Sequence, residues 1–223
     1  FLVAKLCKVN VLEFSIGFGP KILEKQGKQT KYSLRLIPLG GFVNLEGENE
    51  QVDKEGSFSN ASIPKRIAIV LAGGMVNIIF GVLVFFILVL CITQINKAQN
   101  PINENIYFSL IKTKEFIFSI LESLKMLFTG KVGVDQFMGP VGISQAISQT
   151  TRIEDYIYMI SLISLSLGVT NLLPVPALDG GKIVLLLIEA IRKKKLKEQT
   201  EINIQLIGFA ILITLSLYVA YND

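Results

Sequence analysis

A carboxylate stands in a proline-rich stretch that directly follows a long apolar segment. The stretch reads Asn171-Leu-Leu-Pro174-Val-Pro176-Ala-Leu-Asp179-Gly-Gly. Two prolines this close together remove backbone donors and interrupt a helix. Broken backbone at membrane depth is tolerated where it lines a cavity or is covered by protein, and an aspartate placed there is functional by default. We therefore expect a functional role for Asp179. The alternative is that it only caps a helix over 182–191.

The usual partners of a functional carboxylate are missing from this chain. The sequence has no histidine, which removes the commonest zinc ligand and the commonest general base. Cys7 and Cys91 are its two cysteines, and Cys91 falls in an apolar segment, so neither a disulfide nor a cysteine metal site is expected. Asp179 therefore cannot perform metal or acid–base chemistry with these residues alone.

The elements that must position Asp179 are predicted to be membrane helices. Hydrophobic residues make up 51% of the 223 residues and charged residues 18%, with a mean hydropathy of +0.53. Ordinary soluble domains carry about 25% charged residues. A bilayer core of ~30 Å takes about 20 apolar residues to cross as a helix. Three segments are long enough, at 67–93, 156–173 and 202–221, and they predict an all-α polytopic membrane protein with three complete transmembrane helices.

The basic residues predict the orientation of these helices. Ten of the 22 Lys and Arg lie in 1–66 and six more in 182–197. An excess of Lys and Arg marks the cytoplasmic side of a membrane protein, so 96–152 and Asp223 are expected outside. The basic run at 192–197 is expected to touch anionic lipid head groups. Membrane lipids, and no nucleic acid, are therefore the predicted partners of this charge.

The segment 11–45 alternates polar and apolar residues and is punctuated by Gly and Pro. This pattern, with a polar turn at 26–29, predicts short strands joined in a β-hairpin. An edge strand at membrane depth must face protein or a wet cavity, and it can accept a guest peptide by strand addition. The alternative is a cytoplasmic hairpin that only connects two helices.

The organisation predicted along the chain has six parts. These are the end of an upstream helix (1–10), a membrane-associated hairpin with a cytoplasmic loop (11–60), a transmembrane helix (64–95), an extracytoplasmic linker with amphipathic helices (96–152), a transmembrane helix with the Asp179 motif and the helix after it (153–191), and a basic loop with the C-terminal transmembrane helix (192–223).

Several motifs in order resemble the bacterial site-2 protease family, the intramembrane zinc metalloproteases, and in particular the regulator-of-sigma-E type. The most specific is Asn-x-x-Pro-x-Pro-x-Leu-Asp-Gly at 171–180. The others are Gly17-Phe-Gly-Pro20, Pro38-Leu-Gly-Gly-Phe42, Ala72-Gly-Gly-x-x-Asn77, Gly139-Pro-Val-Gly-Ile143 and Ala220-Tyr-Asn-Asp223. The resemblance covers nearly the whole chain.

The resemblance implies a zinc centre to which this chain contributes one ligand. In the family an upstream His-Glu-x-x-His motif supplies two histidine ligands and a glutamate that activates water. The third ligand is the Asp of the Leu-Asp-Gly motif, here Asp179. Phe1-Leu-Val-Ala-Lys5 resembles the residues that follow the second histidine, so this sequence is expected to start just past that motif and to be inactive alone.

The resemblance also implies roles for other residues. Asn171 is expected to hold the substrate backbone or the developing oxyanion, and Pro174 and Pro176 to shape the pocket. The segment 32–45 matches the family's membrane-reentrant hairpin, whose edge at Gly40, Gly41, Phe42 and Val43 would bind the unwound substrate.

The function implied is zinc-dependent hydrolysis of a peptide bond within a transmembrane segment. The expected substrate is a single-span membrane protein, such as an anti-sigma factor or a signal-peptide remnant, in a bacterial inner membrane. Two features depart from the family: 93–106 is too short for the usual PDZ domain, since domains take about 50 residues or more, and Ala72-Gly-Gly replaces Ala-Gly-Pro. The alternatives are a secondary transporter, which predicts an inverted repeat that the sequence does not show, and a pseudoprotease that binds without cutting.

Overall fold

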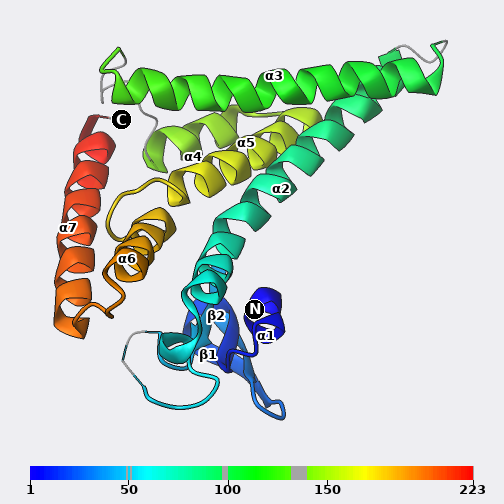
Figure 1. Cartoon of the computed structure of the whole chain (residues 1–223). Helices are drawn as coiled ribbons and strands as arrows, with labels where there is room; N and C mark the ends of the chain where they lie inside the picture. Colours follow the sequence, from blue (N-terminus) through cyan, green and yellow to red (C-terminus); the bar gives the residue numbers. More distant parts are fainter. Residues whose placement is uncertain (49, 51, 97–99, 132–139, 223) are drawn as a thin grey trace. The chain divides into compact units, whose positions relative to one another are not determined.

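A computed structural model of the chain describes residues 1–48, 50, 52–96, 100–131 and 140–222. It contains two strands, one 3-10 turn and seven helices among the described residues (Figure 1). These elements are α1 (Leu2–Leu6), β1 (Val11–Gln26), β2 (Lys31–Leu45), η1 (Phe58–Asn60), α2 (Ile63–Asn96), α3 (Ile102–Phe128), α4 (Pro140–Gln149), α5 (Ile153–Asn171), α6 (Asp179–Arg192) and α7 (Glu198–Asn222).

In the part of the chain that the structure describes, three helices are long and apolar enough to cross a membrane, namely Ile63–Asn96, Ile153–Asn171 and Glu198–Tyr221. The prediction of three transmembrane helices with a small β-hairpin is therefore confirmed. The boundaries differ by a few residues. The second helix ends at Asn171 rather than at 173, because the residue before a proline, here Leu173, is pushed out of helical geometry. The third begins at Glu198, where acidic residues favour a helix N-terminus.

The chain divides into two compact units, each made of two segments. The first unit contains Phe1–Ala72 and Gly180–Ile204, and the second contains Gly73–Asp179 and Gln205–Asp223.

The first unit is built around a small hydrophobic core beside the hairpin. Its buried members come from several elements: Ala4 of α1, Val9 just before β1, Val11 of β1, Leu45 of β2, Phe58 of η1 and Val70 of α2. These residues are at most 9% exposed. The loop after β2 thus returns to the hairpin, because Phe58 packs beside the residue that ends β2.

The hairpin is more irregular than simple alternation predicts. β1 and β2 are joined by a turn at 27–30, and the start of β1 at Glu13–Ile16 has partners in both halves of β2, at 41–44 and at 31–34. Strand β1 bends at Gly17, where φ is +85° and an added Cβ would lie 2.7 Å from the carbonyl oxygen of Ile37. Glycine is therefore required at this bend.

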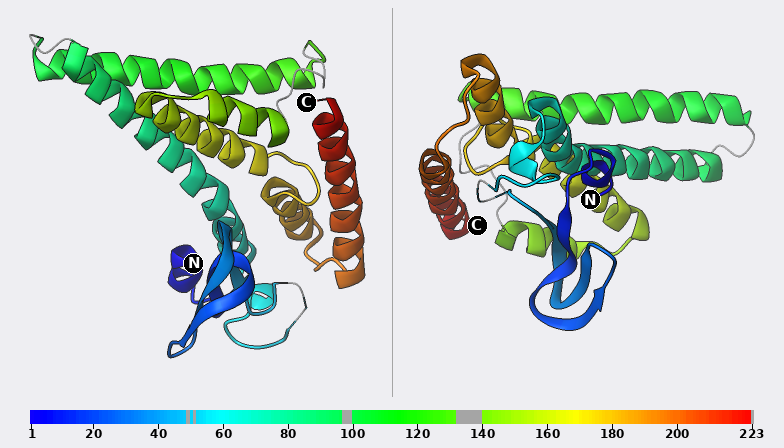
Figure 2. Two further views of the ribbon diagram at one scale, coloured as in Figure 1. Left: turned by 180° about the vertical axis from the view of Figure 1, so that it is seen from behind. Right: turned by 60° about the horizontal axis from the view of Figure 1, so that its bottom comes forward.

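The second unit is a bundle in which α5 and the later part of α2 lie side by side (Figures 1 and 2). Glycines make their close approach feasible: an added Cβ at Gly81 would lie 2.7 Å from the Leu165 backbone nitrogen, and one at Gly168 would lie 2.7 Å from the Gly74 carbonyl oxygen. The hydroxyl of Ser164 donates to the carbonyl oxygen of Asn77 at 2.9 Å. Small residues such as these let membrane helices approach closely.

Helix α3 packs on α2 and α5 within the second unit. The rings of Phe85 (α2) and Phe116 (α3) stack with centroids 4.0 Å apart, and Tyr158 (α5) lies 6.0 Å and 5.9 Å from them. Asn105, which is 1% exposed, donates from its amide to Gln94 at 2.9 Å. Helix α3, which falls in the segment predicted to hold amphipathic helices, therefore lies against the other helices of this unit. Gly139, the first residue of the Gly139–Ile143 motif, lies outside the described residues; α4 begins at Pro140.

Candidate active site

A seven-residue break, 172–178, separates α5 from α6. Helix α5 ends at Asn171, and the backbone then makes short local bonds: Leu173 N–H donates to Thr170 at 3.0 Å and Val175 N–H donates to Leu173 at 2.7 Å. Ala177 has a φ of +73°, a conformation that non-glycine residues seldom adopt and that recurs at functional sites. The break that the two prolines predicted is present.

Asp179 is the first residue of α6, so the helix begins one turn earlier than the predicted 182–191. Its carboxylate lies beside α2: a Cβ added to Gly73 would stand 3.3 Å from Asp179 Oδ2. Because Gly73 has no side chain, the carboxylate of Asp179 can lie close to the backbone of α2. The sequence offered Gly73 only as part of the Ala72-Gly-Gly-x-x-Asn77 motif, and its proximity to Asp179 was not predicted because the two are 106 positions apart.

The neighbouring residues of the break are fixed by close packing. Gly74, next to Gly73, leaves room for Leu172, since an added Cβ would lie 2.9 Å from that side chain. Pro176 packs against α7 at Gly208, where an added Cβ would overlap the Pro176 ring and carbonyl group. Gly208 is a second residue that the sequence analysis missed. The break therefore has α2 on one side and α7 on the other.

Asn171 and Pro174 lie in the same segment of the second unit. Asn171 is the last residue of α5 and is half-buried, whereas Pro174 is exposed. The structure therefore brings Asn171, Pro174, Pro176 and Asp179 onto one break and its two flanking helix ends. The remaining predicted site residues, Gly40–Val43, belong to the first unit.

The predicted substrate edge is the last part of β2. Gly41, Phe42 and Val43 pair with Ile16, Ser15 and Phe14 of β1. One edge of this stretch pairs with β1. Among the residues described, no strand pairs with its other edge. Gly41 lies so close to the carbonyl oxygen of Ser15 that a side chain would overlap it. The stretch is thus an edge strand, as predicted.

A polar network between β1 and β2 stabilises the hairpin that carries this edge. Glu13 accepts from the Ser33 hydroxyl at 2.6 Å and from Arg35 at 2.8 Å. These bonds, that of Ser33 first and that of Arg35 second, lower the pKa of the Glu13 carboxyl. The Arg35 guanidinium also lies 5.0 Å over the ring of Phe42, which stacks on Phe18 at 6.3 Å. The ring of Phe42 therefore packs against two residues of the hairpin itself, Arg35 and Phe18.

The described residues contain no group of three His, Cys, Asp or Glu side chains that could hold a metal ion. Asp179 fits a zinc ligand in chemistry, because it is a carboxylate at a helix start with space beside it. It is a single donor, however, and the chain has no histidine. A zinc centre with Asp179 and histidine ligands therefore requires histidines from outside these 223 residues.

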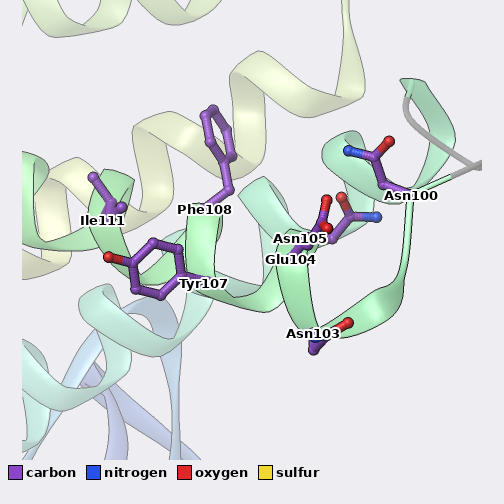
Figure 3. Close-up of a pocket in the computed structure, with 7 residues that line it drawn as sticks. All are labelled: Asn100, Asn103, Glu104, Asn105, Tyr107, Phe108 and Ile111. Atoms are coloured by element: carbon purple, nitrogen blue, oxygen red, sulfur yellow. The ribbon is translucent and has the colours of Figure 1, made fainter.

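A groove of about 650 Å³ opens elsewhere in the second unit, at the start of α3 (Figure 3). It is lined by Asn100, Asn103, Glu104, Asn105, Tyr107, Phe108 and Ile111. None of the predicted site residues borders it. Its lining of amides, one carboxylate and aromatic rings does not combine a nucleophile with a base.

Comparison with known proteins assigns the chain to a family. The sequence pattern of "Peptidase family M50" matches residues 1–215. A putative zinc metalloprotease of Clostridium acetobutylicum is 28% identical over 308 residues, which cover 100% of this chain and 91% of that protein. The zinc metalloprotease RasP of Shouchella clausii is 42% identical over 107 residues, covering 47% of this chain and 26% of that protein, and RasP of Bacillus licheniformis is 37% identical over 132 residues, covering 56% and 32%. With a sequence match of this extent and three helices long enough to span a membrane, the chain belongs to peptidase family M50, the zinc metalloproteases of site-2 protease type.

Proposed function

We propose that the protein to which this chain belongs is an intramembrane zinc protease that hydrolyses a peptide bond within a transmembrane segment of a membrane protein. The observation that carries the proposal is the placement of Asp179 at a helix start, beside Gly73 of an apolar helix and directly after a proline break. A carboxylate costs free energy in such surroundings, so its presence favours a functional role.

In this proposal Asp179 is a zinc ligand. When bound, zinc supplies Lewis-acid polarisation of the scissile carbonyl and activation of water. The contribution of this chain is to hold the carboxylate oxygen in place: the packing of Gly73 beside Asp179 and of Gly208 beside Pro176 limits movement at both sides of the break. Histidine ligands are needed in addition, and they must come from residues other than the 223 of this chain.

Asn171 is proposed to bind the substrate backbone, or the oxygen on which charge develops during hydrolysis. It lies at the end of α5, where the helix gives way to the break, and its amide can donate a hydrogen bond to such an oxygen. Pro174 and Pro176 are proposed to shape the pocket, because they hold the break open without backbone donors of their own.

The edge of β2 at Gly40, Gly41, Phe42 and Val43 is proposed to bind the substrate by strand addition. Its pairing with β1 leaves one edge without a partner strand in the described part of the chain. A transmembrane helix shields its own carbonyl groups, so the substrate must unwind before a peptide bond can be attacked. Backbone hydrogen bonds to an edge strand would stabilise the extended form. The hairpin is then membrane-reentrant, as its exposed Phe18, Ile22 and Leu36 allow.

The proposed setting is a bacterial inner membrane, crossed by α2, α5 and α7, with a single-span membrane protein as substrate. The excess of Lys and Arg in 1–66 and 182–197 would place both segments on the cytoplasmic side of this membrane, where 192–197 would contact lipid head groups. The match to the Clostridium protein runs over 308 residues against 223 here, which leaves at least 85 positions without a counterpart in this chain. This difference fits the expected lack of a PDZ domain.

The decisive experiment uses the full-length protein in proteoliposomes with a single-span substrate. Asp179→Asn should abolish cleavage and lower bound zinc, because an amide is a poor zinc ligand. Asp155→Asn, a matched change in the first turn of α5, should cleave as the wild type does. Asn171→Ala should slow turnover while zinc is retained. Normal cleavage by Asp179→Asn would overturn the proposal, and a wild-type protein that binds the substrate without cutting it would instead be a pseudoprotease.

A further inference from the structure

A buried aromatic ring in the first unit lies close to two cations from distant parts of the chain. Phe58 of η1 is 1% exposed. The guanidinium of Arg66 (α2) lies 5.1 Å from the centre of its ring, and the ammonium of Lys182 (α6) lies 5.0 Å from it. Attraction between a cation and an aromatic face is strongest when the pair is shielded from water. We call Arg66, Phe58 and Lys182 the Phe58 cluster.

Each cation of the Phe58 cluster also pairs with a carboxylate. Lys182 Nζ donates to Glu48 at 3.0 Å, and Arg66 Nη1 donates to Glu189 at 2.7 Å. The Arg66–Glu189 pair is buried, with side chains 8% and 5% exposed, and the other oxygen of Glu189 accepts from the Leu196 backbone N–H at 2.8 Å. Breaking a buried pair of this kind leaves an uncompensated charge, so the cluster resists rearrangement.

The Phe58 cluster connects the proposed substrate edge to the helix that begins with Asp179. On one side, Leu45 ends β2 and packs in the core with Phe58, whose N–H donates to the Glu46 carbonyl at 2.7 Å. On the other side, Lys182 lies three residues after Asp179, which places the two on one face of α6 about one turn apart. The contacts therefore run from the edge strand, through a loop and a buried ring, to the first turn of α6.

We propose that Lys182, with Arg66 and Phe58, is a positioning residue for cleavage: it holds the first turn of α6, the helix that begins with Asp179, to the loop that leaves the substrate edge. This inference rests on the proposed function of Asp179. A lysine used only for membrane orientation would need neither a buried aromatic ring nor a carboxylate partner, whereas Lys182 is 15% exposed and contacts both.

The test compares three changes in the full-length protein. Lys182→Met keeps the aliphatic stem and removes the charge, Lys182→Arg keeps the charge, and Lys194→Met is the matched control in the exposed basic run. We expect Lys182→Met to lower kcat about tenfold, the usual scale for a residue that orients a metal ligand, at unchanged KM. It should also release zinc to a chelator several-fold faster. Lys182→Arg should restore both values, and Lys194→Met should match the wild type.

A readout that needs neither zinc nor cleavage keeps this test separate from the proposed function. In metal-free protein, amide hydrogens in the first turn of α6 should exchange faster in Lys182→Met than in the wild type. Glu48→Gln, a change on the half-buried loop side of the same pair, should reproduce that effect if Lys182→Met does not fold. Wild-type exchange, kcat and zinc release in the folded variant would overturn the positioning role even when Asp179→Asn is inactive. Cleavage by Asp179→Asn would overturn the zinc assignment instead.

Discussion

The break at 172–178 and the edge strand at the end of β2 are held in place by opposite means. The break is confined by steric contacts, with Gly73 and Gly74 leaving room for Asp179 and Leu172, and Gly208 for Pro176. The edge is stabilised by strand pairing on one side and by the Glu13–Arg35–Ser33 network. We therefore expect the break to be sensitive to side-chain volume and the edge to backbone donors and charge.

The largest effect is expected at the crossing of α2 and α5. Gly168→Ala places a Cβ 2.7 Å from the Gly74 carbonyl oxygen, so the helices must separate. Overpacking of this kind costs about 1–3 kcal/mol of unfolding free energy. The unfolding midpoint of the full-length protein in detergent should fall. Leu167→Ala, an exposed neighbour on the same helix, is the control and should change it little. An unchanged midpoint for Gly168→Ala would show that the helices do not pack this closely.

The next effect is expected at Gly208, within the contact of α7 with the break. Gly208→Ala must displace Pro176, since the new Cβ would overlap its carbonyl group. Catalytic geometry is lost with small displacements, and about 100-fold can be lost for a shift of ~1 Å. Cleavage should therefore fall at least tenfold while the protein stays folded and substrate binding at the edge of β2 persists. Ala210→Gly, two residues along α7, is the comparison variant. Full activity of Gly208→Ala would remove Pro176 from the pocket.

A smaller and more specific effect is expected from proline at the edge. Successive N–H groups of a strand point to opposite edges. Of Phe42→Pro and Val43→Pro, one therefore removes a donor on the free edge and the other a donor facing β1. The first should raise KM for the substrate with the hairpin intact, and the second should disturb the hairpin itself, as measured by amide exchange. If neither variant raises KM, strand addition at this edge is wrong.

The smallest effect is expected for protonation of Glu13. Its pKa lies below the ordinary 4.5 because Ser33 and Arg35 bond the ionised carboxylate. The folded hairpin thus binds protons less readily than the unfolded chain, so this stabilisation is present at neutral pH and is lost as the pH falls through the lowered pKa. Glu13→Gln should flatten the acid dependence of amide exchange in β2 as the pH falls below the ordinary carboxyl pKa of 4.5.

The control for this pH dependence is Glu24→Gln on the outer arm of the same hairpin. Hydrogen bonds from Lys21 and Lys31 lower the Glu24 pKa as well, but its side chain is 38% exposed and solvent screens its pairs. We expect a weaker change in acid dependence there. An equal change in both variants would mean that burial of the Glu13 network has no special role.

The two regions also differ in how far the sequence could predict them. The break was predictable because Pro174 and Pro176 act locally through their own rings. The hairpin was predicted as a pair of strands, but its double register was not, since the bend at Gly17 depends on contact with Ile37. The contact of Phe58 with Lys182 joins residues 124 positions apart, and no local pattern indicates such a pair.

The sequence by itself determined that three helices can span a membrane, that the second is followed by a proline break, and that Asp179 stands at its end. These properties follow from the length of each apolar segment and from the backbone chemistry of proline, both of which depend only on residues close together in the sequence. Only the tertiary structure decided that Asp179 begins α6 beside Gly73, that Gly208 confines Pro176, and that Arg66 and Lys182 both contact the buried ring of Phe58. Each of these depends on excluded volume and charge between segments that meet only when the chain has folded.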